Sequence, residues 1–144
     1  MHSPETREGK VRAGHHLAAG RAYADAAKMI LSQDMAGTRS MPFFALVAHG
    51  FELAFKVVLI RNGWSEDRLM LIGHDISRCR DAALSRGDLV IDDTTAKIVD
   101  ALGPAHARQC FRYPQPVTEN PPDAATALDC LHRLIDTLGA SESH

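Results

Sequence analysis

The sequence predicts an all-α fold, an up-and-down bundle of four main helices with one or two short extra helices. Apolar residues recur at spacings of three and four in several stretches, which is the pattern of a helix with one buried side. Glycine, proline and capping residues separate these stretches. The run at residues 88–91 is too short to predict a strand. A helical bundle is therefore the fold class that fits the whole chain.

The size and composition of the chain fit one globular domain. It has 144 residues, of which 45% are hydrophobic and 24% are charged, as in ordinary soluble domains. We expect a flexible N-terminus over residues 1–12, one helical domain over 13–138 and a polar tail over 139–144. The net charge of −2 argues against a strongly basic nucleic-acid-binding domain, although it leaves room for a local basic patch.

A long central helix is predicted between Ser40 and Gly63. Ser40 suits the N-cap, Pro42 falls where a missing N–H is harmless, and Gly63 suits the position after the helix end. Fifteen of the twenty residues from Met41 to Ile60 are apolar. A helix of this composition must be covered by neighbours on most sides, so we expect the bundle to be organised around it.

The polar residues of the central helix form one narrow stripe. At about 100° per residue, His49, Glu52 and Lys56 fall within roughly 60° of arc. The two charges also argue against a membrane span, because charged side chains are costly in lipid. We therefore expect a soluble core helix and no membrane association.

The other helices follow from local start and stop signals. Two predicted ranges are 13–34 and 76–86. A short helical turn is predicted through residue 71, a helix of two to three turns is predicted to end at residue 102, and a last helix is predicted to end at about residue 138. The predicted N-caps are Ser65, Asp75, a residue within 92–94, and the segment 120–123. Gly103-Pro104 is expected to stop the helix that starts near residue 93, which leaves residues 103–120 irregular. Gly139 is expected to end the last helix.

Cysteine usage indicates the compartment. The three cysteines, Cys79, Cys110 and Cys130, are odd in number and widely spaced. This usage is typical of free thiols in a reducing compartment and not of a disulfide framework. The first ten residues, MHSPETREGK, contain no apolar segment of the kind found in secretion signals. A cytoplasmic location is therefore expected.

Motifs for cofactor or metal chemistry are missing from the sequence. It contains no G-x-x-x-x-G-K-[ST] loop, no G-x-G-x-x-G fingerprint, no C-x-x-C and no H-E-x-x-H. The nearest approach to a metal-binding pattern is His49-x-x-Glu52, and one such pair cannot supply a closed set of ligands. We therefore expect no metal and no cofactor.

The Gly73-His74-Asp75 turn is the predicted partner of the polar stripe. Gly73 permits a close backbone approach, and Asp75 is needed as the N-cap of the next helix. His74 is then available to donate to Glu52, while Lys56 balances the carboxylate charge. The alternative is a solvated Glu52–Lys56 surface pair, which would contribute only about 0.3–0.5 kcal/mol. In both cases we expect a cluster that is more structural than catalytic.

The order of four segments resembles the HEPN (higher eukaryotes and prokaryotes nucleotide-binding) superfamily. The segments are HGFELAFKVVLIRNGW, IGHDI, LSRG and FRYP. In that family a Glu-Leu-Ala-x-Lys-like central helix is followed by a His-Asp-Leu-like helix start. The resemblance covers residues 13–138 and implies a bundle of four to five helices that is frequently dimeric. Many members are ribonucleases of bacterial defence or toxin–antitoxin systems; others are inactive companions of nucleotidyltransferases, or binding modules.

The family's ribonuclease motif is an Arg followed about four to six residues later by a His, near the start of a late helix. The match in this chain is Arg68 with His74, which lies in mid-chain and before a different helix. The late region offers Arg108, Arg112 and Tyr113, residue types that contact a phosphate or stack on a base. Neither of these late arginines has a histidine at the family's spacing.

Three functions remain open from the sequence. The first is a non-catalytic HEPN-like module that forms a homodimer and binds a partner protein, such as a nucleotidyltransferase, or a nucleotide or RNA. The second is a metal-independent ribonuclease with an atypical site, using Arg68 and His74. The third is a helical bundle without a ligand. The candidate binding residues are Glu52, Lys56, His74, Asp75, Arg108, Arg112 and Tyr113.

Overall fold

The computed structural model describes residues 6–33, 40–107 and 122–142. Within these ranges there are six helices and no strand: α1 (Arg7–Leu31), α2 (Ser40–Arg61), α3 (Glu66–Ile72), α4 (Ile76–Leu84), α5 (Asp93–Ala107) and α6 (Ala124–Glu142). The predicted all-α class is confirmed, with four long helices and the short helices α3 and α4.

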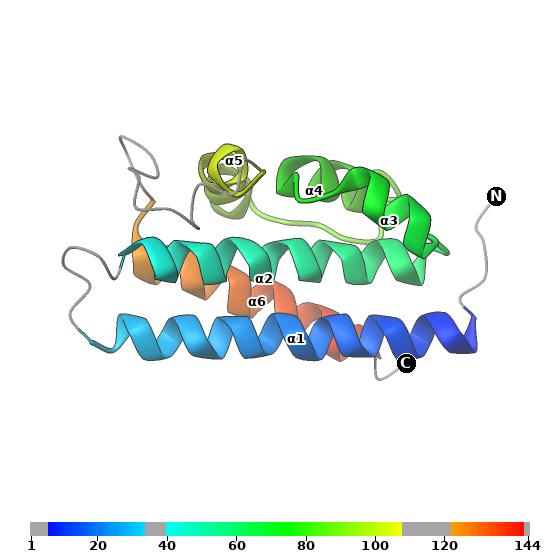
Figure 1. Ribbon diagram of the computed structural model, residues 1–144, viewed down its shortest axis with the longest axis horizontal. Helices are drawn as coiled ribbons and strands as arrows, with labels where there is room; N and C mark the ends of the chain where they lie inside the picture. The colour runs from blue at the N-terminus through cyan, green and yellow to red at the C-terminus, as the bar shows by residue number, and fades with distance from the viewer. Residues whose placement is uncertain (1–5, 34–39, 108–121, 143–144) are drawn as a thin grey trace.

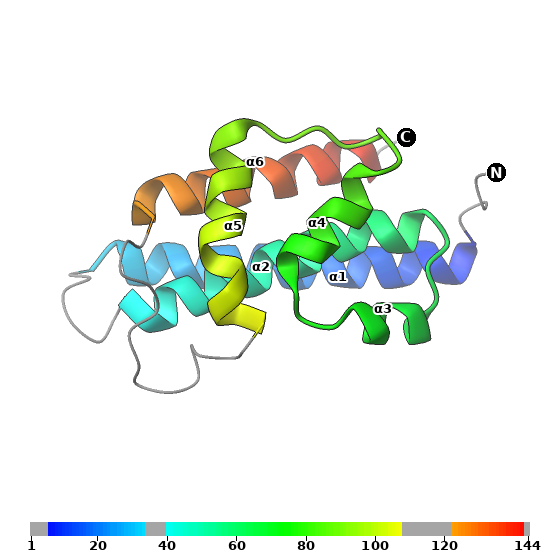
Figure 2. The same ribbon diagram turned by 90° about the horizontal axis from the view of Figure 1, so that it is seen from above.

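The bundle is arranged around α2 (Figure 1). The helices α1, α2 and α6 run along the long dimension of the molecule, and α1 is antiparallel to α2. Seen from above, α5 crosses α2 instead of running along it, α4 lies over the later half of α2, and α3 lies to one side of α2 (Figure 2). One side of α2 therefore faces α1 and α6, and the other side faces α4 and α5.

Burial confirms that α2 is the central helix. Its side chains Phe43, Phe51 and Phe55 are fully buried. Among the helices described, only the segment Pro42–Arg61 is long and apolar enough to cross a membrane, but 78% of its most apolar window is buried inside the fold. This burial is consistent with the core helix of a soluble protein, because its apolar surface is already covered by protein.

The side of α2 that faces α1 and α6 is apolar and closely packed. Gly50 lies where the three helices meet: a Cβ atom added to it would lie 2.7 Å from Leu131 Cδ2 and 3.6 Å from the carbonyl oxygen of Gly20. Ala24 and Ala27 of α1 are fully buried. Small side chains at this crossing allow the helix backbones to approach one another closely.

Helix starts follow the predicted capping signals. The side chains that accept a hydrogen bond from the backbone N–H three residues later are Ser65, Asp75, Asp92 and Asp123. The first helix differs from the prediction, because it begins at Arg7 with Thr6 as its N-cap and includes residues 7–12. There the Thr6 hydroxyl accepts from the Gly9 N–H at 2.8 Å. The predicted capping by Ser40 concerns a side chain outside those described.

The predicted stop at Gly103-Pro104 is wrong. The helix α5 continues through both residues to Ala107. Pro104 removes one backbone hydrogen bond, but Gly103 packs so closely that an added Cβ atom would lie 2.8 Å from Ser77 Oγ of α4. Packing of α5 against α4 therefore outweighs the local stop signal. Gly139 likewise does not end α6, which runs on to Glu142.

The described cysteines are free, as predicted. Cys79 in α4 and Cys130 in α6 are buried and form no disulfide. Burial raises the pKa of the Cys79 thiol to about 12. Cys110 lies outside the described residues.

Candidate functional site

A cluster of polar side chains lies on the side of α2 that faces α4 and α5. We call it the Glu52 cluster, and its members are His49, Glu52, Lys56, His74 and His106. Helix α2 supplies the first three, at spacings of three and four along one stripe. The turn between α3 and α4 supplies His74, and the last turn of α5 supplies His106. Three separate segments of the chain therefore meet at one carboxylate.

Both oxygen atoms of the Glu52 carboxylate are hydrogen-bonded. Oε1 lies 2.7 Å from His106 Nε2 and 3.0 Å from His74 Nδ1, and Oε2 accepts from Lys56 Nζ at 2.9 Å. An ionised carboxylate only accepts hydrogen bonds, so His106 donates through Nε2–H and His74 through Nδ1–H. The Glu52 side chain is only 4% exposed, so these donors replace water as its partners.

The environment keeps Glu52 ionised. Burial by itself would raise the pKa of Glu52, but the hydrogen bonds from His106 and Lys56 and the positive charge of Lys56 lower it to about 2. The Lys56 side chain is itself only 10% exposed. Glu52 and Lys56 are therefore a buried ion pair, and the removal of either partner leaves a buried charge without its counterion.

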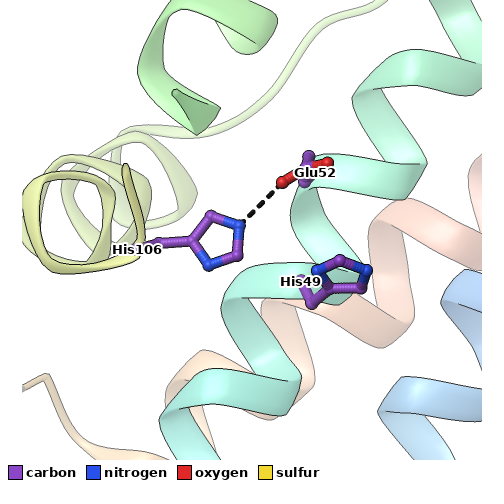
Figure 3. A group of neighbouring side chains, drawn as sticks. All are labelled: His49, Glu52 and His106. Carbon is purple, nitrogen blue, oxygen red and sulfur yellow. Dashed lines mark hydrogen bonds and ion pairs between the residues drawn. The ribbon is translucent and has the colours of Figure 1, made fainter. Parts of the chain in front are cut away.

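His49 stands one helical turn before Glu52 and is held by ring contacts. Its ring centroid lies 4.5 Å from that of Tyr23 in α1 and 5.8 Å from that of His106. Burial is the largest effect on the pKa of His49 and lowers it from the ordinary value of 6.5, against the attraction of Glu52. Figure 3 shows His106 reaching from α5 to Glu52, with His49 below it on α2.

The turn that carries His74 is shaped by its two neighbours. Gly73 has φ of +65°, a left-handed conformation that favours glycine, and the Asp75 side chain caps α4. The predicted contact of this turn with the polar stripe is confirmed by the His74–Glu52 hydrogen bond. The His74 side chain remains 49% exposed. A neutral His74 that donates through Nδ1–H carries its lone pair on Nε2, so it can act as a base.

The two residues of the atypical Arg/His motif, Arg68 and His74, contact different groups. The guanidinium of Arg68 lies over the Trp64 ring, 3.8 Å from its centroid, whereas His74 contacts Glu52 and His106. Asp75 acts as a helix cap. The other candidate binding residues, Arg108, Arg112 and Tyr113, lie outside the described residues.

Sequence reasoning missed His106 because it ended the helix at Leu102. The signal was present: Val99, Leu102 and His106 follow at spacings of three and four, so they share one side of a continuous helix. All three are buried. Pro104 predicts a helix end before His106, so this spacing was not extended to His106.

No family model, curated protein or solved structure matches this chain. The HEPN relationship therefore stays a prediction that rests on the sequence segments quoted above.

Proposed function

We propose that this chain is a non-catalytic HEPN-like helical module that dimerises and binds a partner protein, a nucleotide or RNA. The observation that carries the proposal is the His74–Glu52 hydrogen bond, 3.0 Å long, beside the Glu52–Lys56 ion pair. It joins two of the four segments on which the HEPN resemblance rests, the central helix and the His-Asp turn. These residues hold one segment against the other, which favours a binding module over an enzyme.

The positions of the cations also favour a module without catalysis. A ribonuclease needs a base for the 2′-hydroxyl and a cation to stabilise the charge that develops on the phosphate. Arg68 is engaged with Trp64, and Lys56 is buried against Glu52. Such engaged cations are poorly suited to a substrate phosphate. A bacterial defence or toxin–antitoxin system, with a nucleotidyltransferase as partner, is the setting that the resemblance implies.

The proposed homodimer uses the exposed side of α1. Val11 and Met29 are large apolar side chains that are 54% and 70% exposed. They are eighteen residues apart, which is five complete turns, so they lie on the same line along the helix. Light scattering coupled to gel filtration should give twice the chain mass of 15.7 kDa at micromolar concentration. A monomer of the wild-type protein would contradict the dimer, and Val11→Lys/Met29→Lys should convert the dimer to a monomer.

The test of the binding function uses labelled single-stranded RNA in a buffer with a chelator. Fluorescence anisotropy should report RNA binding, and a denaturing gel should show intact RNA after incubation. Arg108→Ala/Arg112→Ala should weaken binding, because arginines neutralise phosphates, whereas the matched pair Arg78→Ala/Arg86→Ala in the α4 region should not. A dimer that binds neither RNA nor nucleotide would narrow the function to partner-protein binding, and a monomer that binds neither would support the bundle without a ligand.

A metal-independent ribonuclease is the second candidate, and one observation favours it. Glu52 orients a half-exposed His74 through Nδ1, as a carboxylate orients the histidine base in many hydrolytic enzymes. RNA cleavage by the wild-type protein that disappears in His74→Ala, with circular dichroism unchanged, would replace the first candidate with this one. Arg68→Ala tests, in the same assay, whether Arg68 supplies the cation of that ribonuclease site.

A further inference from the structure

We infer that His49, Glu52 and His106 form a binding site for a divalent transition-metal ion such as Zn²⁺. Each residue offers one ligand atom, and these atoms all lie within 4.8 Å of one another. Two imidazoles and one carboxylate are a donor set that Zn²⁺ accepts readily. The sequence expectation of no metal relied on the His49-x-x-Glu52 pair alone, whereas α5 adds a third donor. This inference does not rest on the proposed function.

The donors lie near one another, but they must move to bind the ion. Zn²⁺ bonds to nitrogen and oxygen at about 2.0–2.1 Å, so neighbouring ligand atoms in a tetrahedral site lie roughly 3.3 Å apart. The observed separation of His106 Nε2 and Glu52 Oε1 is 2.7 Å. Opening this contact slightly and turning His49 inward would place all three donors around one point. The turn of His49 gives up its ring contact with Tyr23, whereas α2 and α5 already hold the backbones of the three residues together.

The surroundings hold the carboxylate in place for metal binding. Lys56 occupies Oε2 of Glu52, and Oε1 is the oxygen that faces His106. The positive charge of Lys56 opposes a cation, but it also fixes the orientation of the carboxylate. Three protein ligands would leave a fourth position for water or another small molecule, as in open zinc sites.

Metal binding replaces one hydrogen bond of the cluster. In the metal-free protein His106 donates Nε2–H to Glu52. When the ion binds, its bonds to His106 Nε2 and Glu52 Oε1 take the place of this hydrogen bond, and the neutral His106 ring carries its one proton on Nδ1. His74 contacts the same oxygen of Glu52 but lies outside the group of three donors.

The test is a titration of chelator-treated protein with Zn²⁺ in a calorimeter. We expect one ion per chain for the wild-type protein. His49→Ala should weaken the affinity at least tenfold, and it leaves all three hydrogen bonds of Glu52 in place, so the fold should be retained. His74→Ala is the matched control, because it removes a histidine from the same carboxylate and should change the affinity less than threefold. Circular dichroism checks the fold of both variants.

A second control separates this site from surface binding. The residues His15 and His16 in α1 are the one pair of adjacent histidines in the sequence. His15→Ala/His16→Ala should leave one ion bound. Loss of binding in that variant, wild-type affinity in His49→Ala, or no binding by the wild-type protein would each overturn the inference. Co²⁺ gives an independent readout, since its visible absorption should appear with the wild-type protein and fall with His49→Ala.

Discussion

The two sides of α2 are built on different physical principles. Towards α1 and α6 the helix presents Gly50, which packs against Leu131 and the backbone of Gly20 with no space for a methyl group. Towards α4 and α5 it presents Glu52, a buried charge with three hydrogen-bond donors. The first side is stabilised by close packing, and the second by compensation of charge.

The difference between the two sides shows how α2 positions four other helices in two ways. Close packing is sensitive to volume and insensitive to pH, and it brings α1 and α6 to a fixed distance from α2. The hydrogen bonds of the Glu52 carboxylate depend on the presence and protonation of each donor. These bonds fix where the α3–α4 turn and the end of α5 lie. The position of the polar partners therefore depends on charge, and the position of the packed partners depends on volume.

The largest expected effect comes from the polar side. Glu52→Ala leaves Lys56 buried without its counterion and removes the acceptor of His74 and His106. We expect a loss of about 2–4 kcal/mol in the free energy of unfolding, measured with urea. Glu66→Ala is the matched control, because Glu66 pairs with Arg12 at the surface.

The control variant Glu66→Ala should change the free energy of unfolding very little. The Glu66 side chain is 69% exposed, so its pair with Arg12 should contribute no more than about 0.5 kcal/mol. A change below roughly 0.5 kcal/mol for Glu52→Ala as well would contradict a buried, stabilising contact between Glu52 and the turn that carries His74.

On the packed side, Gly50→Val should destabilise the protein by about 1–3 kcal/mol. The added side chain overlaps Leu131, whose own side chain is fully buried and has little room to move. Thermal unfolding measures the effect. Gly139→Ala in α6 is the control, since its Cβ atom would lie 3.5 Å from Arg21 Nη2, an ordinary contact. That change should be neutral or stabilising by up to about 1 kcal/mol, because alanine favours helix.

Of the two sides of α2, the polar side is the one that should make stability depend on pH. The folded pKa of Glu52 is about 2 and its ordinary pKa is 4.5, so the unfolded chain takes up the proton first. The stabilisation from Glu52 is therefore complete above pH 4.5 and is lost as the pH falls towards 2. The pKa of His49 is lowered from 6.5, so its contribution is complete above pH 6.5 and decreases at lower pH. Lys56, His74 and His106 are the charged and titratable neighbours that influence both groups.

The measurement is urea unfolding at several pH values between 7 and 3 in the presence of a chelator. Glu52→Ala should reduce the slope of the profile below about pH 4.5, and His49→Ala should reduce it just below pH 6.5. The lowered pKa values of Asp92 and Asp123, outside the cluster, leave part of the acid dependence in place. Gly50→Val should shift the whole profile downward without changing its shape. Wild-type slopes in both cluster variants would contradict the assignment of the pH dependence to this side.

The smallest expected effect concerns thiol reactivity, which should be the same on both sides of α2. Cys79 and Cys130 are 0% and 1% exposed, so neither should react with a thiol reagent in the native protein. Denatured protein without reductant should give three free thiols, which include Cys110. A count of one would reveal a disulfide and overturn the argument for a reducing compartment.

Local sequence patterns were sufficient to predict most residues of the polar side of α2. The stripe of His49, Glu52 and Lys56 follows from helical spacing, and Asp75 as N-cap places His74 at the start of α4. The sequence therefore predicted the His74–Glu52 contact. It did not predict the contribution of His106, because Gly103-Pro104 is a strong local stop signal.

The sequence by itself determined the all-α class, the central position of α2 and most helix starts, since periodicity and capping act over only a few residues. Only the tertiary structure decided that α5 continues past Pro104 and brings His106 to Glu52. Only the tertiary structure decided, likewise, that Gly50 packs against Leu131. These features depend on packing between segments far apart in the chain, and the free energy of that packing exceeds the cost of one lost backbone hydrogen bond.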